Sequence, residues 1–570
     1  MRTLSVGTQG RGMAAALTLA EAVVPVLLLI AAFAVRAWAA APIDFPVTEP
    51  SAYYWGVARN LVEGRGLVSD ALWTYPAGVP TFPRPAFEMW LPLPALLAAL
   101  PMALLGTSYE SAQLSSVVLG ALVAPLAWLL GRGAALARGL SRGRVAMVAL
   151  GSGLAGAVLP PLLVADVAPE STTPFTVLAL TIALLMPTTR ETTRPRRATV
   201  ARITVGLLLG LAYLCRNEAI YLGLAYLIFT LADGRWPLSA RLSQLLPTVV
   251  AGALTVLPWL VRDLLVLGTP IPGGTLELAL MTRNEQLFAS AERPTLRAFV
   301  DAGLMGMVLR QVAALGRNLA DVILFPMGPM GAIGILTLLA AIIGRVPRLF
   351  SSSPLKVLVL VGLTIYLVSS LVFPVASAWG TFRHAAGPLL VGLSVVAVLG
   401  LDAFVAAVGH RRGWQRSNAW LAPLAALVLT VPLALLQVWL FNAQGTALED
   451  RYGRLAAALE TLPQLDDAPR AGDAPGTQAA VMSDHPIWLA EAIRRPVAAL
   501  PDESPTQVWR LARRLDVPLL VVIDRRGRYP AIIDIRRGEC FRPVSGSADR
   551  FAGARVVTFD PRSCPPEAPR

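Results

Sequence analysis

Long apolar runs recur along the whole 570-residue chain, and this repetition is the feature that most restricts its fold. Many runs approach the ~20 residues that an α-helix needs to cross the ~30 Å hydrocarbon core of a bilayer. Hydrophobic residues make up 55% of the chain and charged residues only 15%, which argues against a soluble protein of this size. A transmembrane β-barrel would instead show short segments of alternating hydrophobicity. The sequence therefore predicts an all-α polytopic membrane protein.

Charge decides which apolar segments cross the membrane, because cytoplasmic loops carry an excess of arginine and lysine. With a cytoplasmic N-terminus and with 89–106 in the membrane interface, arginine-rich loops such as 132–144 and 188–202 lie inside. A crossing by 89–106 would place these loops outside, and its three prolines also disfavour a straight helix. We therefore expect eleven spans, at about 13–38, 110–131, 145–165, 172–187, 203–215, 218–232, 245–267, 320–344, 357–376, 386–408 and 419–441.

The apolar stretch 203–232 is interrupted at its middle by Arg216, Asn217 and Glu218. One long helix would reverse the sidedness of the loops that follow, whereas two short helices preserve it. Each short helix would rise only about 20 Å, so the charged turn would lie below the outer membrane surface. Ionisable residues at that depth are costly and commonly functional. The interruption therefore predicts a cavity cut into the outer leaflet.

The chain divides by composition into a membrane domain, 1–443, whose first outer loop is 39–109, a linker, 444–476, and a tail, 477–570. The tail is polar and reads as a small α/β domain, and an odd number of spans places it outside the cytoplasm. Cys540 and Cys564 could then form a disulfide. In the tail we expect strands at 497–501, 518–526 and 554–560 and helices at 488–495 and 507–516.

Ionisable residues collect on the predicted outer face. Carboxylates there could act as general bases or orient hydroxyl groups, and arginines at the same depth could bind a phosphate. A single charged residue at a span end more often marks the interface than a site. Glu170 and Glu218 stand out because apolar helix flanks them on both sides. The candidates are Asp44, Glu49, Arg59, Arg84, Glu170, Arg216, Glu218, Arg262, Arg383 and His384.

The sequence does not indicate a metal site, an ATPase or a nucleic-acid-binding protein. The three histidines, His384, His410 and His485, are widely separated, and no Cys/His spacing fits zinc. No P-loop occurs. The net charge of +13 comes almost wholly from arginines scattered through short loops, which is typical of membrane topology.

Several short motifs occur in a fixed order along residues 13–410. Thr48-Glu49-Pro50-Ser51-Ala52-Tyr53-Tyr54 is followed by Ala58-Arg59, then by Pro83-Arg84-Pro85, Pro169-Glu170, Arg216, Pro258-Trp259 with Arg262-Asp263, and Arg383. This set resembles the GT-C glycosyltransferases, nearest to the branch with the protein O-mannosyltransferases and the lipid A aminoarabinose transferases. The chain departs from the family at one place, since the adjacent Asp-Glu pair before the tyrosine is absent.

The resemblance implies an integral-membrane hexosyl- or pentosyltransferase of the plasma (inner) membrane. It would move a sugar from a polyprenyl-phosphate donor to a lipid, glycan or protein acceptor at the outer face, without a nucleotide, metal or other cofactor. Glu49 or Asp44 would take the proton of the acceptor hydroxyl. The substrate-binding residues would be Tyr54, Arg59, Arg84, Glu170, Arg216, Glu218, Arg262, Arg383 and His384.

Two other functions stay open at this point. A transporter or lipid flippase would need a polar path through the spans, where ionisable residues are scarce. A non-catalytic relative that binds lipid or a partner is kept open by the missing acid pair.

Overall fold

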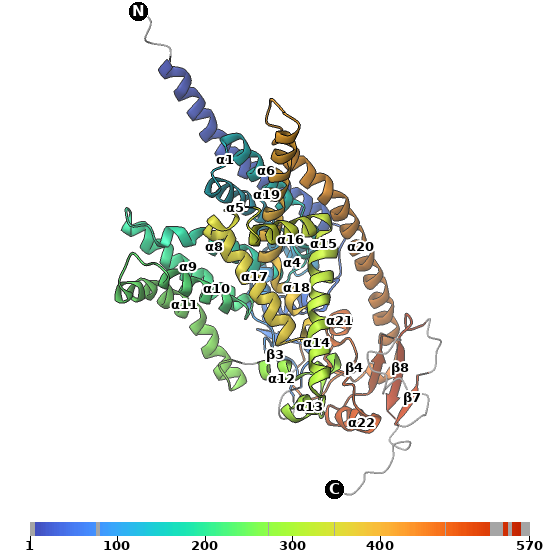
Figure 1. Cartoon of the computed structure of the whole chain (residues 1–570). Coiled ribbons are helices and arrows are strands. Elements are labelled where there is room, and N and C mark those ends of the chain that lie inside the picture. The colour runs from blue at the N-terminus through green and yellow to red at the C-terminus, as the bar shows by residue number, and fades with distance from the viewer. Residues whose placement is uncertain are drawn as a thin grey trace, which may run out of the picture.

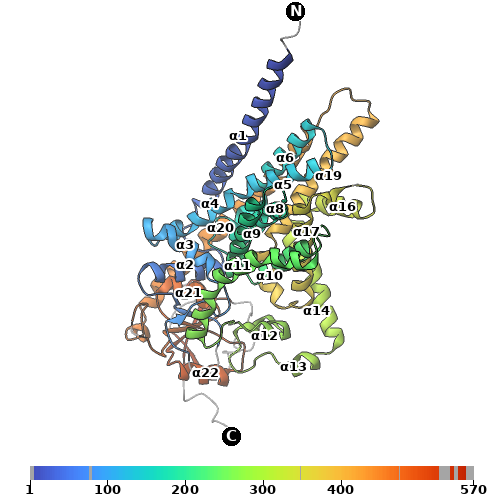
Figure 2. The same ribbon diagram turned by 90° about the vertical axis from the view of Figure 1, so that its left-hand side faces the viewer.

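The computed structural model describes residues 6–75, 80–271, 273–346, 348–473, 475–524, 540–544 and 550–559, with side chains from residue 22 onward. A helical bundle forms the upper part of the molecule and a mixed α/β domain the lower part (Figures 1 and 2). Helix α1 (Val6–Ala40) begins at the upper end, and α20 (Leu421–Glu460) descends from the bundle to the α/β domain. The start of the described chain and the α/β domain therefore lie at opposite ends of the molecule.

Within the described residues, eight helices are long and apolar enough to cross a membrane, or nine if one bent pair counts as a span. The all-α membrane fold is thus confirmed, although three of the eleven expected ranges, 145–165, 218–232 and 320–344, fall on shorter or interrupted helices. The bundle helices are α4 (Tyr109–Ala121), α5 (Val123–Ala137), α6 (Arg142–Ala157), α7 (Pro160–Ala165), α8 (Thr172–Thr189), α9 (Pro195–Cys215), α10 (Ala219–Leu231), α11 (Leu238–Leu267), α14 (Leu304–Arg317), α16 (Pro329–Ile342), α17 (Ser353–Leu371) and α19 (Gly387–Arg411), together with α1 and α20.

The span predicted at 320–344 is not one continuous helix. A π-helical turn, η2 (Asn318–Leu324), and the short α15 (Phe325–Met327) continue α14, and the chain then bends by 117° into α16. Gly328 makes the bend with a φ of +55°, a conformation that suits glycine. Pro329 follows at the start of α16, where its missing N–H costs nothing.

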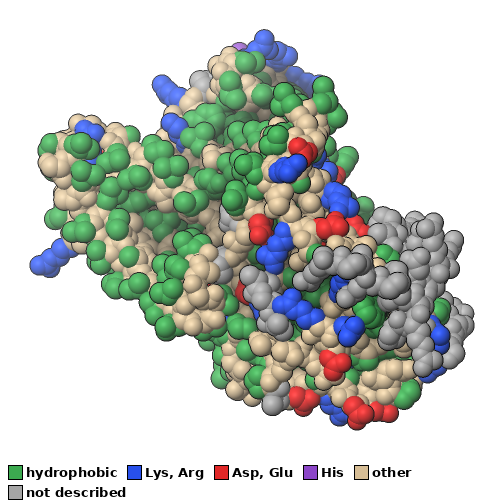
Figure 3. Space-filling model, turned by 90° about the horizontal axis from the view of Figure 1, so that it is seen from below, with side chains coloured by type: hydrophobic (Ala, Val, Ile, Leu, Met, Phe, Trp, Pro, Cys, Tyr) green, Lys and Arg blue, Asp and Glu red, His purple; other side chains and the backbone are tan. Residues whose placement is uncertain are grey.

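The distribution of charge predicts a short helix at 89–106 and two short helices at 203–232, and all but one of these are short, since α9 has 21 residues. Helix α3 (Leu93–Leu105) has 13 residues, so it rises only about 20 Å and is too short to cross a bilayer. The stretch 203–232 is divided into α9 and α10, because Arg216 adopts an extended backbone with φ −155°. Helices α9 to α11 form a lobe beside the bundle (Figure 1). The surface of this lobe is largely hydrophobic (Figure 3).

The α/β domain contains a six-stranded sheet in the order β2-β5-β4-β6-β8-β7, with α21 (Pro486–Ile493) and α22 (Pro505–Arg514). Strands β2, β5, β4 and β6 run parallel, whereas β8 is antiparallel to β6 and β7. The predicted tail strands and helices are present, but β4 and β7 were missed. The strands are β2 (Ala71–Leu72), β4 (Val481–Ser483), β5 (Val497–Ala499), β6 (Leu519–Val522), β7 (Phe541–Pro543) and β8 (Arg555–Phe559).

The edge strand β2 belongs to the first outer loop, so the tail is not an independent unit. Residues of that loop, including Trp73 and Tyr75, share one buried hydrophobic core with β4, β5 and β6. Helix α20 also continues to Glu460 through the first part of the predicted linker. Cys540 is buried and disulfide-bonded, whereas Cys564 lies outside the described residues, so the pairing of these two cysteines stays a prediction.

The remaining short elements connect these parts on the side of the α/β domain or between bundle helices. They are α2 (Glu49–Val62), β1 (Val68–Ser69), β3 (Arg84–Pro85), α12 (Thr275–Leu280), η1 (Asn284–Phe288), α13 (Leu296–Asp301), η3 (Leu349–Ser351), η4 (Ala376–Trp379), α18 (Thr381–Ala385) and η5 (Pro463–Leu465).

Candidate functional site

A cavity of about 490 Å³ lies where the bundle meets the α/β domain. This volume lies within the ~300–1,000 Å³ that small-molecule sites occupy. Its wall is built by the start of α2, the segment from α7 to α8, η2, α18, α20 and the start of α21. Four predicted site residues line it, Glu49, Glu170, Arg383 and His384. Asp321 and His485, which were not predicted as site residues, line it as well.

Glu49 is the first residue of α2, and the helix places its carboxylate at the cavity. Thr48 caps the helix, since its hydroxyl accepts the backbone N–H of Ser51 at 3.3 Å. A carboxylate in the first turn of a helix is stabilised by the helix dipole. His485 Nδ1 lies 2.8 Å from Glu49 Oε1, so the α/β domain holds this carboxylate directly.

Glu170 lies in the short segment between α7 and α8 and is almost fully buried. His384 Nδ1 lies 3.1 Å from its Oε2, and the Thr48 hydroxyl donates to its Oε1. Burial alone would raise the pKa of this carboxyl. The charge and hydrogen bond of His384, the hydrogen bond of Thr48 and the charge of Arg383 outweigh burial, so the pKa lies below its usual range. Glu170 is therefore an anion at neutral pH.

The segment that carries Glu170 is anchored by a buried ion pair. Arg36 of α1 donates from Nε to Asp166 Oδ2 at 2.8 Å, and neither side chain is exposed. The Thr173 hydroxyl donates to the other oxygen of Asp166 at 2.6 Å. Gly120 makes room for this carboxyl group, since a Cβ there would lie 2.5 Å from Asp166 Cγ. Helices α1, α4 and α8 thus fix one wall of the cavity.

Arg216 and Glu218 stand behind the cavity wall and do not line the cavity. Arg216 pairs with Glu218 at 2.7 Å and donates to the Ser171 hydroxyl at 2.9 Å. It also donates to the Thr381 carbonyl at 3.1 Å. Because Thr381 begins α18, Arg216 joins the segment of Glu170 to the helix of Arg383. These contacts give Arg216 a supporting position.

The structure does not bring the other predicted residues to this cavity. Asp44 is exposed. Tyr54 packs against Trp90 in the core of the first outer loop. Three arginines are engaged in ion pairs, Arg59 with Glu491 at 2.5 Å, Arg84 with Glu88, and Arg262 with Asp263 at 2.8 Å. The prediction that Asp44 and Arg262 share a cavity with Glu49 is therefore wrong.

Arg262 was grouped with Glu49 and Arg383 because all three have a similar predicted depth in the membrane. A shared depth does not determine on which side of the bundle a residue lies. Arg262 stands near the end of α11, where Trp259 packs against Phe87 of the first outer loop. Its guanidinium lies 4.8 Å above the Trp259 ring and does not line the cavity that Arg383 lines.

Two cavity residues were missed for different reasons. Asp321 stands alone in an apolar run that was read as a span, but it lies on the π-helical turn η2. The sequence does contain a signal for this break, namely an acidic residue in an apolar run that is followed by Gly328-Pro329. His485 was set aside because it lies far along the chain from His384, although the fold brings both to one cavity. Among the described residues, no group of three or more His, Cys, Asp or Glu side chains could hold a metal ion.

No protein-family model matches this sequence, and no curated protein matches it. Solved structures with similar folds include those of two proteins. ArnT from Cupriavidus metallidurans aligns in the apo state with a TM-score of 0.55 and 14% identity, over 95% of this chain and 99% of that chain. The complex of the same protein with undecaprenyl phosphate aligns with a TM-score of 0.54.

The second fold relative is the archaeal oligosaccharyltransferase AglB from Archaeoglobus fulgidus, in complex with an inhibitory peptide and a dolichol-phosphate. It aligns with a TM-score of 0.54 and 14% identity, over 88% of this chain and 69% of that chain. Both relatives match the chain across the bundle and beyond it, as the motif resemblance in the sequence implied.

Proposed function

From the GT-C glycosyltransferase fold of this chain, we propose that it is a membrane glycosyltransferase that moves a sugar from a polyprenyl phosphate to an acceptor. One observation carries the proposal. The cavity between the bundle and the α/β domain holds the carboxylate of Glu49 together with the cationic side chain of Arg383. A general base and a phosphate-binding group are the two elements that such a transfer needs.

The reaction assigns a role to each group. An oxygen of the acceptor hydroxyl attacks the anomeric carbon of the sugar, and the bond from that carbon to the phosphate oxygen breaks. Glu49 takes the proton of the hydroxyl, and the polyprenyl phosphate leaves with the electron pair of the broken bond. Arg383 and His384 neutralise the charge that develops on this phosphate. Glu49 supports this assignment better than Asp44, because Asp44 is exposed and does not line the cavity.

The positions of the other candidates refine the proposal. Glu170 is engaged by His384 and Thr48, so we assign it to orienting His384. We assign Arg216 and Glu218 to supporting the wall. The membrane domain would lie in the plasma membrane with the α/β domain outside the cytoplasm. A hexosyl or pentosyl group fits the cavity volume, and the acceptor would be a lipid, glycan or protein.

A transporter or lipid flippase is the competing function. It would need a polar path between both faces, whereas the charged residues that line this cavity gather at the end that carries the α/β domain. The position of the cavity therefore favours transfer at one face.

The proposal is tested with the purified protein, radiolabelled polyprenyl-phosphate sugars and membrane extract as the acceptor. We expect labelled product from the wild type and a loss of about 100-fold or more in the rate for Glu49→Gln. Asp44→Asn is the matched control and should retain the wild-type rate. Absence of transfer with every donor, or equal rates for Glu49→Gln and Asp44→Asn, would refute the proposal.

A further inference from the structure

The carboxyl ends of the parallel strands in the α/β domain face the cavity, and ligands commonly bind at this edge of an α/β sheet. The chain passes from β4 through α21 to β5 on one side, and then through α22 to β6 on the other side of β4. The carboxyl ends of β4 and β6 therefore flank a topological switch point, and open α/β sheets bind their ligands there. Asp484 and His485 directly follow β4 at this edge.

The loop that carries His485 is held on both sides. The Asp484 carboxylate accepts the backbone N–H groups of Ile523 and Asp524, each at 2.8 Å, which joins the end of β4 to the end of β6. On α21, Trp488 donates its indole N–H to the Pro46 carbonyl at 2.9 Å. Since Pro46 lies three residues before Glu49, the same loop is fixed relative to the start of α2.

We propose that His485 is a positioning residue for the Glu49 carboxylate, so that the transfer site is complete only when the α/β domain is docked on the first outer loop. This inference rests on the proposed function. The distance of 2.8 Å from Nδ1 to Oε1 is that of a strong hydrogen bond. The two side chains are 17% and 14% exposed, so water competes little for the contact.

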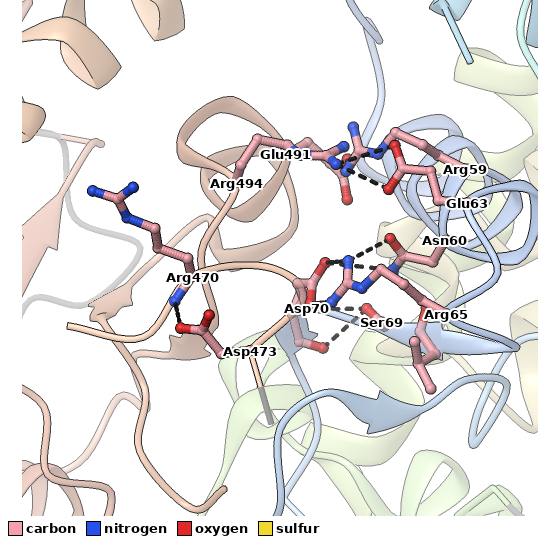
Figure 4. Close-up of polar contacts among 12 residues, drawn as sticks. Arg59, Asn60, Glu63, Arg65, Ser69, Asp70, Arg470, Asp473, Glu491 and Arg494 are labelled. Atoms are coloured by element: carbon pink, nitrogen blue, oxygen red, sulfur yellow. Dashed lines mark hydrogen bonds and ion pairs between the residues drawn. The ribbon is translucent and has the colours of Figure 1, made fainter. Parts of the chain in front are cut away.

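Docking of the domain does not itself require this bond. Arg494 at the end of α21 pairs with Glu63 at 3.0 Å, and Arg59 pairs with Glu491 in the buried part of the same interface (Figure 4). The His485 contact is distinct because it lines the cavity and holds a group that we assign to proton transfer. A displacement of about 1 Å in such a group can reduce the rate 100-fold.

The test compares four variants of the full-length protein. His485→Ala removes the donor, and His485→Asn places an amide nitrogen at the position of Nδ1. His485→Gln places its amide at the position of Nε2, so it keeps bulk without the contact. Arg494→Gln is the matched control, since it removes an exposed contact of the same helix with α2 and does not touch Glu49.

We expect His485→Ala and His485→Gln to lower kcat by about tenfold or more while the donor KM is retained. His485→Asn should recover most of the rate, and Arg494→Gln should retain it. A merely structural role would instead give similar losses in the Asn variant and the Arg494 control. Equal kcat for all four variants and the wild type would also overturn the inference.

A second measurement decides the inference without any transfer. Carbodiimide-driven coupling of glycine ethyl ester to Glu49, followed by mass spectrometry, reports how accessible the carboxylate is. We expect faster coupling in His485→Ala than in the wild type, His485→Asn or Arg494→Gln. Equal coupling in all of them would overturn the positioning role. If the wild type transfers no sugar but the coupling differs as expected, the proposed function fails while the contact stands.

Discussion

Removal of Arg36 should destabilise the protein strongly, because it leaves the Asp166 carboxylate buried without its cation. Arg36 gives this carboxylate a hydrogen bond of 2.8 Å, and it also donates to the Ala157 carbonyl at 2.9 Å. The change Arg36→Met keeps a long apolar side chain of similar shape. It therefore removes the charge and the hydrogen bonds while it leaves little new space.

The surroundings set the size of the effect. Breaking one partner of a buried ion pair costs about 3–5 kcal/mol. Water could reduce this cost, but the close approach of Gly120 to the Asp166 carboxyl leaves no room for a water molecule on that side. Thr173 remains as one hydrogen-bond donor. We therefore expect a loss of about 3 kcal/mol or more in the free energy of unfolding.

Equilibrium unfolding in mixed micelles of increasing SDS content, followed by circular dichroism, measures this loss. The second variant is Arg36→Met with Asp166→Asn, which removes both charges and should recover most of the stability. Arg454→Gln is the control, because its pair with Asp450 is exposed and should contribute less than about 1 kcal/mol. The reasoning is refuted if Arg36→Met costs no more than Arg454→Gln.

Three further predictions concern the cavity and its support. Arg383→Ala should weaken the binding of a polyprenyl phosphate by about tenfold or more, since a charged hydrogen bond contributes ~1.5–3 kcal/mol. Calorimetric titration measures this affinity. An unchanged affinity would contradict the assignment of Arg383 to phosphate binding. Burial raises the pKa of Glu170, but His384, Thr48 and Arg383 together lower it below its usual value. The contribution of Glu170 to stability is therefore present above the usual carboxyl pKa and is lost as the pH falls through the lowered value. Glu170→Gln should flatten the dependence of thermal stability on pH in this acidic range, and an unaltered pH profile contradicts the prediction. Gly56→Ala should destabilise the protein by about 1–3 kcal/mol, because the new Cβ would lie 2.0 Å from Glu491 Oε1. Gly223→Ala is the control, since its Cβ would meet no atom within 4 Å, and it should be neutral in the same unfolding assay.

Much of the membrane domain could be predicted because span formation is a local property. A long apolar run must form a helix in a bilayer, since the backbone has no other hydrogen-bonding partner there. The arginine-rich loops then fixed the treatment of 89–106 and 203–232. Helices α3 and α10 are short as predicted, whereas α9 begins at Pro195 and is long enough to cross a bilayer. The exception is 320–344, where Gly328 and Pro329 together turn the chain.

The site could be predicted only as far as topology reaches. Glu170 and Arg383 lie at the same end of adjacent helices, so their shared depth also brought them to one cavity. Arg262 lies on α11 beside Trp259, which packs against the core of the first outer loop, and no property of the sequence gave this position. His485 depends on how two separated segments dock, which hydrophobic periodicity does not encode.

The contact between α2 and α21 explains why composition misplaced the domain boundary. Both helices run side by side in the same direction, since the successive pairs are Glu49 with His485, Arg59 with Glu491, and Glu63 with Arg494.

Glu49 and Glu63 are 14 positions apart, a rise of about 21 Å, so the contact extends along the whole of α2. Gly56 lies inside this contact, where a Cβ would lie 2.0 Å from Glu491 Oε1. The position of the Glu49 carboxylate is therefore set by the register of a complete helix pair. Loss of the exposed pair of Glu63 with Arg494 alone leaves this register in place, because the buried pair of Arg59 with Glu491 and the hydrogen bond of Trp488 to Pro46 remain.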